Sequence, residues 1–427
     1  MVSCVNNIKD SVKGTELEKR GNTYICEWGT KHAQEDQNEE TNRTKFRRER
    51  DRILYTGGFR RLQDKTQVIA ATKNGDHRTR LTHSLEVEQI AVSLADALGL
   101  NRDLVAAIAI GHDVGHTPFG HAVERFLDKR LKDKGGFSHA VQSVRYLKDK
   151  PVKLSNEVIE GILKHDTDVY SGAYDKKQFD CTEYKPLKPG NLESQVVYWA
   201  DKIAYLTHDF EDFYLTDIYK KCKENNEGLE SGLQNILAEL IPEKKEQIKC
   251  DINNFKTRDL IRNVLRNLIN ESLERLKNLE VSKTTLNTDI IREETEKRIS
   301  EIEENLKEND KNSDINKIKK KAYQKGLIIN FEENYREQYE NLREILNKHY
   351  VKSPEVQRND AKAMKIVEVL FKEFTKKPGI LPLNIQKKIK SNDDKDRIVA
   401  DYIASMTDRY AEEVFINLNS IGNYYDY

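Results

Sequence analysis

The chain has 427 residues, enough for one large domain or two of ordinary size. It carries 72 basic and 72 acidic side chains, so net charge favours neither a general nucleic-acid binder nor an acidic partner, and any basic function must be local. Five scattered cysteines without a CxxC pair argue against a disulfide scaffold, and no apolar run is long enough to span a membrane, so we expect a cytoplasmic protein.

The N-terminal residues differ in character from the rest of the chain. Residues 1–42 are polar and irregular, and we expect an arm with little core. From residue 43 the pattern becomes helical and rich in arginine up to Arg61, for which a solvated basic face is the alternative interpretation. Only eight prolines, 34% charged residues and repeated apolar stripes with a 3.6-residue period predict an all-α protein.

Two apolar helices come next. The first carries His83 in its first turn and is expected to end at Gly99. Asn101 is a good N-cap for the second helix, which is apolar enough to be buried on most sides. The second helix delivers His112 and Asp113 at its end.

A turn broken by glycine and proline comes after these helices, and it is dense in groups that bind metal or move protons. Pro118 suits the first turn of the next helix. In that helix His121 and Glu124 lie three residues apart and can face the same way. His116 precedes them, and His139 begins a further helix.

The remaining chain divides by charge. A helix from about 192 to 214 has an apolar side and a polar face that carries Asp201, and it completes a catalytic core expected over residues 43–222. Residues 223–340 are far more charged and predict a protruding helical insertion, interpreted as a solvated helical pair rather than a catalytic unit. Residues 341–427 recover core character and are expected to pack back on the main body.

The histidines and carboxylates suit one divalent cation that keeps open positions for substrate and water. The residues that supply this set are His83, His112, Asp113 and Asp201. A single histidine is more often a satisfied structural residue, but this clustering favours a metal. The surplus titratable groups nearby indicate catalysis, because a structural metal would be closed by its protein ligands.

Basic residues close to these elements indicate the substrate. They are Arg60, Arg61, Arg80 and Lys202. Guanidinium and ammonium groups bind phosphate oxygens, and the chain has no GxxxxGK[ST] loop that would cradle them instead. The residues therefore predict metal-assisted hydrolysis of a phosphate ester, with cations clamping a polyphosphate.

Several longer motifs carry a family resemblance. They are Phe59 to Val68, Arg78 to Val87, His112 to His121, Ala200 to Tyr205 followed by His208 and Asp209, and Met406 to Tyr410. These stretches resemble the HD superfamily of metal-dependent phosphohydrolases, and among them the bacterial dGTP triphosphohydrolases. The resemblance covers residues from about 43 to 212 and from about 397 to 411, and the charged middle section has no match in it.

The resemblance implies hydrolysis of a deoxynucleoside triphosphate, dGTP by default, to the deoxynucleoside and inorganic triphosphate by water attack at the α-phosphorus. It implies one divalent metal ion, Mn²⁺ or Mg²⁺, with Fe, Co, Ni or Zn also compatible. The implied metal ligands are His83, His112, Asp113 and Asp201, the proton-transfer pair is His116 and Glu124, and the groups near the phosphates are His121 and His139. The implied substrate contacts are Arg80, Lys202 and Tyr205 at the triphosphate, Gln67 and Val68 beside the sugar, and Asp209 at the 3′-hydroxyl.

Two other functions remain open from the sequence. One is an HD phosphodiesterase or nuclease. The other is a nucleotide or single-stranded nucleic-acid sensor, in which the arginine-rich stretch and the charged insertion bind a partner and hydrolysis is secondary. The resemblance also implies a homo-oligomer, a hexamer or tetramer, with a dNTP or single-stranded DNA as an allosteric partner.

Overall fold

The computed structural model describes residues 44–67, 78–166, 184, 188–226, 228–282, 288–309, 315–391 and 394–419. Both the expected N-terminal arm, residues 1–42, and Val68 lie outside these described residues. The described residues form helices, and their only β-type pairing is an isolated bridge between Thr66 and Thr79. The all-α prediction is therefore confirmed. None of the helices described is both long and apolar enough to cross a membrane.

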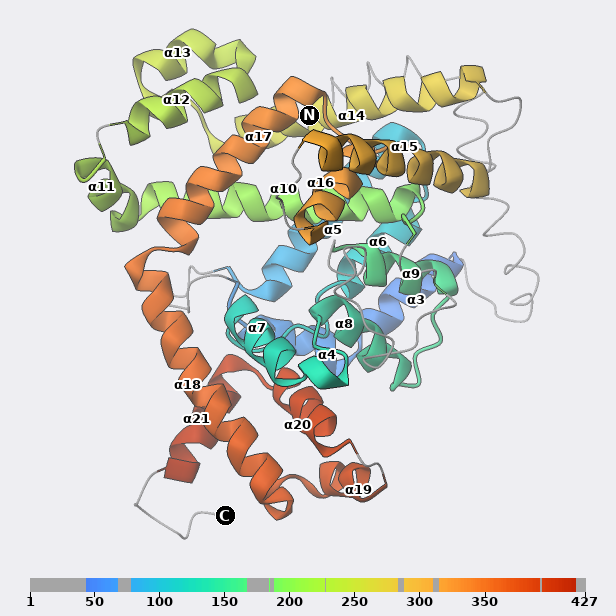
Figure 1. Cartoon of the computed structure of the whole chain (residues 1–427), viewed down its shortest axis with the longest axis vertical. Helices are drawn as coiled ribbons and strands as arrows, with labels where there is room; N and C mark the ends of the chain where they lie inside the picture. Colours follow the sequence, from blue (N-terminus) through green and yellow to red (C-terminus); the bar gives the residue numbers. More distant parts are fainter. Residues whose placement is uncertain are drawn as a thin grey trace.

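The first part of the fold consists of α3 (Lys45–Leu54), α4 (Gly57–Arg61), α5 (Arg80–Leu98), α6 (Arg102–Gly111), α7 (His121–Arg130), α8 (His139–Lys148), α9 (Asn156–Lys164) and α10 (Leu192–Leu215) (Figure 1). The second part consists of α11 (Asp217–Glu224), α12 (Leu229–Leu240), α13 (Lys245–Cys250), α14 (Thr257–Ser282), α15 (Thr288–Asn309), α16 (Ile315–Gly326), α17 (Glu333–Leu346), α18 (Pro354–Lys376), α19 (Leu383–Ser391), α20 (Lys395–Ala404) and α21 (Asp408–Asn419). A π-helical turn, Asn347–Val351, joins α17 to α18.

Local signals set the ends of α5 and α6. Thr79 and Thr82 form a capping box at the start of α5, and Gly99 ends that helix with a left-handed φ of 69°. The side chain of Asn101 accepts hydrogen bonds from the backbone N–H groups of Asp103 and Leu104, at 3.1 and 3.0 Å, which starts α6. The predicted boundaries at Gly99 and Asn101 are confirmed.

The turn before α7 differs from the prediction. The helix begins at His121, and Pro118 lies in the preceding turn rather than in the helix. Phe119 and Gly120 both have positive φ, 57° and 71°, and a right-handed helix cannot pass through that conformation. Asp408 stabilises the turn, because its Oδ1 accepts a hydrogen bond from the Phe119 N–H at 2.8 Å. Because this partner lies far away in the sequence, the local pattern around Pro118 wrongly predicted that the helix begins there.

The main apolar core surrounds α10, which crosses the middle of the molecule (Figure 1). Helices α5, α6, α9, α14 and α17 pack against it. Trp199 of α10 is fully buried and donates its indole N–H to the Ile329 carbonyl at 2.6 Å. The Tyr339 hydroxyl donates to the Lys202 carbonyl at 2.8 Å. These two hydrogen bonds hold the chain that forms α17 against the polar stretch of α10.

A second apolar cluster joins α7 to the C-terminal helices. Val123 and Leu127 of α7 are fully buried among side chains of α18, α20 and α21, including Val367, Leu370 and Ile403. Figure 1 shows α18 to α21 grouped below the main body. The C-terminal helices therefore pack back on the main body, as the sequence predicts, and they do so through α7.

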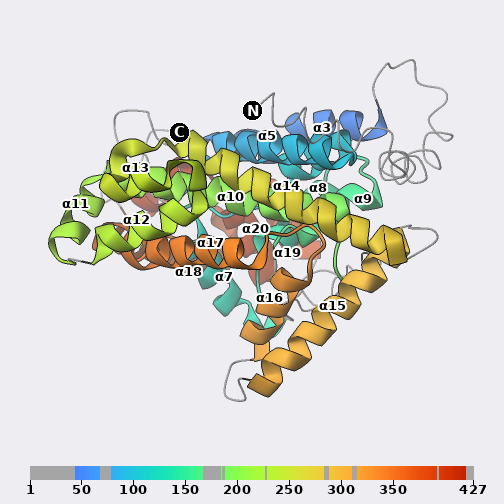
Figure 2. The ribbon, with the colours of Figure 1, turned by 90° about the horizontal axis from the view of Figure 1, so that it is seen from above.

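The charged segment from 223 to 340 contains two kinds of helix. Apolar side chains of α12 and α14, such as Leu233, Leu237 and Leu268, are fully buried within the main core. Helices α15 and α16 pack mainly on each other, and Figure 2 shows them projecting away from the body. One part of this segment, α12 and α14, therefore belongs to the main core, and another part, α15 and α16, projects from the body as predicted.

Gly115 permits the close approach of the turn after α6 to helix α8. A Cβ added at Gly115 would lie 2.2 Å from the backbone nitrogen of Ser143. Because a backbone atom cannot rotate away, we expect Gly115→Ala to lower the free energy of unfolding by about 1–3 kcal/mol, measured by urea denaturation. The control is Gly232→Ala in α12, where an added Cβ meets no atom within 4 Å and the free energy should stay equal or rise by up to about 1 kcal/mol. Equal effects of the two substitutions would contradict this account.

Candidate functional site

Three helices bring the four predicted metal ligands together. His83 lies in the first turn of α5, His112 and Asp113 follow α6 directly, and Asp201 lies in α10. The ligand atoms of His83, His112 and Asp113 all lie within 4.8 Å of one another. Asp201 Oδ1 lies 2.9 Å from His83 Nε2 and 3.8 Å from His112 Nε2. The three helices α5, α6 and α10 therefore meet, as the metal hypothesis requires.

The hydrogen bonds of His112 show that this group fits a cation. Its Nδ1–H donates to the carbonyl of Ala109 at 2.6 Å, and since a carbonyl can only accept, Nε2 of the neutral ring carries the lone pair. That Nε2 is buried and has no hydrogen-bond partner. It faces Asp113 Oδ2 at 3.7 Å and Asp201 Oδ1 at 3.8 Å. An unsatisfied imidazole nitrogen between two carboxylates is the arrangement that a divalent ion completes.

Both carboxylates of this group are held in the ionised form. Burial raises the pKa of Asp113, but the charge of Arg80 outweighs burial and holds that pKa well below its usual range. The guanidinium Nη1 of Arg80 donates to Asp113 Oδ2 at 2.6 Å. Burial also opposes ionisation of Asp201, and the hydrogen bond from His83 nevertheless lowers its pKa strongly. The site is thus ready to bind a cation without first losing protons from its carboxylates.

A second cluster of titratable groups surrounds Glu124. Its members, His116, His121, Glu124 and His139, have ligand or proton-carrying atoms within 4.8 Å of one another. Glu124 Oε1 accepts from the backbone N–H and the Nδ1–H of His139, both at 2.7 Å. Glu124 Oε2 lies 2.8 Å from His121 Nδ1 and 3.9 Å from His116 Nε2. One carboxylate therefore connects three imidazoles.

His165 was not assigned a role from the sequence, although it determines the charge of His139. Its Nδ1–H donates to the Ile162 carbonyl at 2.6 Å, so its Nε2 can only accept. That Nε2 lies 3.0 Å from His139 Nε2, which must therefore carry a proton and donate it. Since His139 also donates its Nδ1–H to Glu124, it is an imidazolium.

The pKa values agree with this assignment. Burial alone lowers the pKa of His139, but Glu124 outweighs it and raises that pKa to about 10. For His165, burial and the charge of the neighbouring His139 lower the pKa to about 4. The pair therefore consists of a charged His139 and a neutral His165 near neutral pH.

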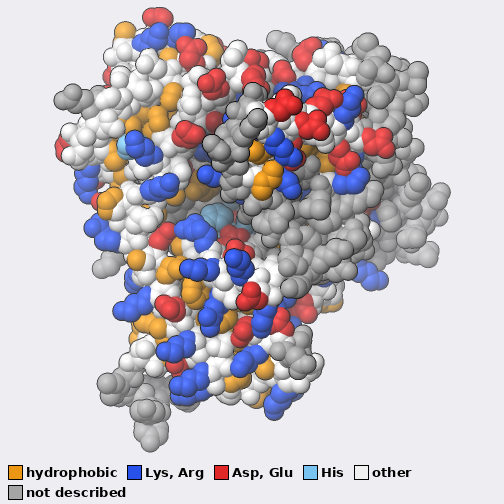
Figure 3. All heavy atoms as spheres, in the orientation of Figure 1, with side chains coloured by type: hydrophobic (Ala, Val, Ile, Leu, Met, Phe, Trp, Pro, Cys, Tyr) orange, Lys and Arg blue, Asp and Glu red, His pale blue; other side chains and the backbone are white. Residues whose placement is uncertain are grey.

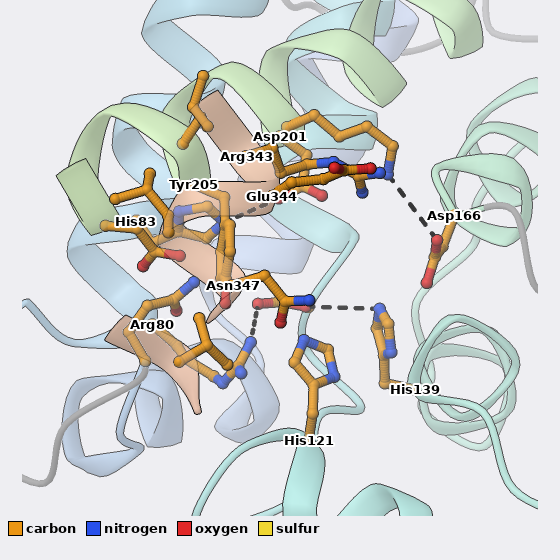
Figure 4. Close-up of a pocket in the computed structure, with 17 residues that line it drawn as sticks. Arg80, His83, His121, His139, Asp166, Asp201, Tyr205, Arg343, Glu344 and Asn347 are labelled. Atoms are coloured by element: carbon orange, nitrogen blue, oxygen red, sulfur yellow. Dashed lines mark hydrogen bonds and ion pairs between the residues drawn. The ribbon is translucent and has the colours of Figure 1, made fainter. Parts of the chain in front are cut away.

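A cavity of about 380 Å³ opens onto these groups (Figures 3 and 4). Figure 3 shows a hollow in which a histidine side chain is visible among basic and acidic side chains. The predicted site residues that line the cavity are Gln67, Arg80, His83, Asp113, His121, His139, Asp201, Lys202, Tyr205 and Asp209. His112, His116 and Glu124 lie behind this lining, and Val68 is outside the described residues.

Comparison with known proteins gives the family. The sequence model of the HD domain matches residues 80–206, and that of the phosphohydrolase-associated domain matches residues 329–416. Deoxyguanosinetriphosphate triphosphohydrolase-like proteins of Rickettsia bellii and Rickettsia felis are each 36% identical over 394 and 398 residues, covering 89% of this chain and 92% of each relative. The chain belongs to this family of HD-domain proteins. It is therefore a hydrolase of the metal-dependent phosphohydrolase class, whose HD domain implies a divalent ion.

Further residues, which the sequence did not single out, complete the lining of the 380 Å³ cavity. They are Asp166, Leu206, Arg343, Glu344, Leu346, Asn347 and Val351. Figure 4 shows Arg343, Glu344 and Asn347 among the side chains that surround the cavity, together with Asp201 and Tyr205. Arg343 lies in α17 just beyond the charged segment 223–340, and a single arginine there has no local signal that separates it from its neighbours. Only the return of α17 onto α10 reveals its position.

Two of the four basic residues assigned to the substrate lie elsewhere. Arg80 and Lys202 line the cavity, as predicted. Arg60 is exposed and donates to the Tyr55 carbonyl at 3.1 Å. Arg61 lines a different cavity. The prediction for Arg60 and Arg61 rested on their closeness in sequence to the site, and it is wrong because α4 directs these side chains away from the histidine clusters.

Lys65 connects the site to the C-terminal helices. Its buried ammonium donates to the carbonyls of His116 and Ala404, the latter at 2.8 Å. Burial, reinforced by the charge of Arg61, lowers the pKa of Lys65 to about 7. Because this pKa lies below the unfolded value, the unfolded chain binds more protons between the two values, and stability must rise with pH from about pH 7.

We therefore expect the free energy of unfolding of the wild type to rise, relative to that of Lys65→Met, as the pH rises from 7 to 9. The gain should approach about 1.4 kcal/mol per pH unit, the value for one proton. Urea denaturation of both proteins at pH 6, 7, 8 and 9 measures the difference. A difference in unfolding free energy that stays constant over this range would show that the Lys65 ammonium is not destabilised by its surroundings.

Proposed function

We propose that the protein hydrolyses a deoxynucleoside triphosphate, with dGTP as the first substrate to test, to the deoxynucleoside and inorganic triphosphate. One observation carries the proposal: a single cavity presents the metal-binding group, the charged His139 and three further cations, Arg80, Lys202 and Arg343. The first two of these cations were predicted from the sequence. A divalent ion together with several fixed cations is the arrangement that binds a triphosphate and stabilises charge developing on it.

The metal set suits Mn²⁺ or Mg²⁺, because two carboxylates contribute hard oxygen ligands, and its imidazoles also tolerate Fe, Co, Ni or Zn. When bound, the ion polarises the phosphoryl oxygens and favours water as a nucleophile. The residues then have separable tasks. Arg80, beside Asp113, fixes the phosphate on the side of α5, while Lys202 and Arg343 hold it from α10 and α17.

Proton transfer is proposed for the Glu124 cluster. Water attack on the α-phosphorus forms a P–O bond and breaks the bond to the sugar O5′, so the attacking water loses a proton and O5′ gains one. Burial lowers the pKa of His116, as does the charge of Arg80, so His116 is neutral and able to accept a proton. His139 carries a proton that it can donate, and Glu124 links it to His121. The cluster therefore holds both a proton acceptor and a proton donor.

Recognition of the sugar is proposed for Gln67, Tyr205 and Asp209, with Val68 as the predicted neighbour of Gln67. Gln67, Tyr205 and Asp209 line the cavity. Burial raises the pKa of Asp209 well above its ordinary value, and a hydrogen bond joins its side chain to Tyr205. A protonated Asp209 can donate as well as accept, which suits a sugar hydroxyl.

The product distinguishes this reaction from other phosphohydrolase reactions. Wild-type protein with Mn²⁺ and dGTP in ¹⁸O-water should release deoxyguanosine and tripolyphosphate, with the label in the tripolyphosphate because the bond to O5′ breaks. Ion chromatography and mass spectrometry measure both products. His112→Ala and Asp113→Ala should lose activity while circular dichroism stays unchanged, because each removes a metal ligand. Release of pyrophosphate, or label in deoxyguanosine, would contradict the proposal.

The same assay tests the two other functions. A phosphodiesterase or nuclease would cleave cyclic or single-stranded oligonucleotide substrates and leave dGTP intact. A sensor would bind nucleotide or single strands with a turnover that His112→Ala does not change. Neither outcome is expected, because the cavity that holds the metal group also holds Gln67, Tyr205 and Asp209 beside the cations.

Glu124→Gln tests the proton-transfer cluster separately from metal binding. The substitution removes the charge that keeps His139 protonated, and we expect kcat to fall by about 10²- to 10⁴-fold. KM and metal content should change little, because Glu124 is not one of the residues grouped around His83. Asp133→Asn, at an exposed carboxylate after α7, is the matched control and should keep wild-type kcat. Wild-type kcat in Glu124→Gln would rule out the proposed role.

A further inference from the structure

The turn between α18 and α19 carries two apolar side chains that face solvent. A short 3₁₀ turn, Pro378–Ile380, follows α18, and α19 begins at Leu383. Ile380 is 45% exposed and Leu383 is 74% exposed. Figure 1 shows α19 and the end of α18 at the bottom of the molecule, below α4 and α8. These two side chains therefore form an apolar tip at one end of the structure.

Packing and hydrogen bonds hold the apolar tip in place. Leu381, which lies between the two members of the tip, is only 3% exposed and packs in the second apolar cluster. The side-chain amide of Gln386 donates to the carbonyls of Gly379 and Leu381, at 3.0 and 2.7 Å. Proline rings on both sides of the tip limit the backbone further. Because the tip is already ordered, a partner that covers it pays little conformational entropy.

Helix α19 has one face in the core and one face in solvent. Ile385 and Ile389, four residues apart, pack against the second apolar cluster. The other face begins with Leu383 and continues, four and seven residues later, with the exposed Lys387 and Lys390. The apolar tip and these lysines therefore lie on the same side of α19.

The surface around the tip is basic although the whole chain is neutral. Residues 372–391 contain six lysines and one acidic residue, Glu373, whereas the chain has 72 residues of each sign. Lys388 pairs with Asp149 at 2.9 Å. Among the residues that the structure describes, no ion pair neutralises the other five lysines, which are Lys372, Lys376, Lys377, Lys387 and Lys390. Figure 3 shows basic and hydrophobic side chains next to one another at this end of the molecule.

An apolar tip flanked by unpaired cations matches a lipid bilayer with anionic headgroups. The acyl layer accepts Ile380 and Leu383, and the headgroups attract the lysines. The long aliphatic stem of lysine lets its ammonium group stay at the headgroup level while the tip enters. A nucleic acid or an acidic protein surface would also attract the lysines, but neither offers a continuous apolar layer to a projecting tip.

We propose that the apolar tip and its lysines dock the protein on the surface of an anionic lipid bilayer, with Ile380 and Leu383 entering the acyl layer. This docking is peripheral and needs no helix that crosses the membrane. It goes beyond nucleotide hydrolysis and does not depend on it, because the tip shares no residue with the cavity of about 380 Å³.

Co-sedimentation of the full chain with vesicles tests the proposal. Wild type should bind phosphatidylcholine vesicles that contain about 30% phosphatidylglycerol at least about tenfold more tightly than vesicles of phosphatidylcholine alone. Added salt should weaken the binding, since it screens the attraction between lysines and headgroups.

Two double variants separate the apolar and the basic contributions. The tip variant combines Ile380→Ser with Leu383→Ser, and the charge variant combines Lys387→Gln with Lys390→Gln. Each should weaken binding to the anionic vesicles by about tenfold or more, because each removes one part of the match.

Matched controls replace similar side chains elsewhere. Leu215 and Ile315 are 73% and 45% exposed, almost the same fractions as the two members of the tip, and their double serine variant should bind as wild type does. The exposed Lys317 and Lys321 of α16 serve in the same way for the charge variant, as a double glutamine variant. Circular dichroism should show the same helix content in all four proteins.

Leu383→Trp reports entry into the acyl layer. Its added fluorescence, after subtraction of the wild-type spectrum, should shift to shorter wavelength on anionic vesicles and be quenched by lipids brominated in their acyl chains. The proposal is overturned by undetectable binding, by equal binding to neutral and anionic vesicles, or by binding that both double variants leave unchanged. Self-association that only the tip variant abolishes, or binding to polyglutamate, would also overturn it if vesicles are not bound, and would assign the surface to another copy of the chain or to an acidic protein.

Discussion

The architecture depends on the burial of charge where α5, α6 and α10 meet. An isolated buried carboxylate costs several kcal/mol, so the buried Asp113 and the half-buried Asp201 are tolerated only because cations and hydrogen-bond donors compensate them. Arg80 compensates Asp113 and His83 compensates Asp201. His112 Nε2 remains without a partner between the two carboxylates, and a bound metal ion would complete this balance of charge.

Backbone carbonyls at helix ends orient the imidazoles. His112 and His165 each follow the last residue of a helix and donate Nδ1–H to the carbonyl three residues earlier, at 2.6 Å in both cases. Such carbonyls lack helical partners, so the same bond satisfies the helix end and directs Nε2 into the site. His112 then faces two carboxylates, whereas His165 faces His139. The same local geometry therefore produces a proposed metal ligand in one place and a neutral hydrogen-bond acceptor in the other.

The sequence could predict the features that depend on local chemistry. The ends of α5 and α6 follow from Gly99 and Asn101, and their apolar faces place His83 and His112 at the core. Features that depend on distant contacts were not accessible. The turn before α7 is held by Asp408, which is 289 residues away from Phe119.

The same limit applies to the cavity walls. Arg343 reaches the catalytic cavity because hydrogen bonds from Trp199 and Tyr339 hold α17 against α10. Arg61 lies four residues before Lys65 yet lines a different cavity. Neither side chain has a local pattern that gives its direction, so a count of basic residues near the histidines could not separate them.

Mn²⁺ binding measured by electron paramagnetic resonance tests the central claim most directly. Chelator-stripped wild type titrated with Mn²⁺ should bind one ion per chain in the group around His83 and Asp201, with nitrogen couplings from imidazole ligands. Asp201→Asn should weaken that binding while the fold stays intact. The absence of a stoichiometric ion, a bound ion without nitrogen couplings, or binding that Asp201→Asn leaves unchanged would contradict the account.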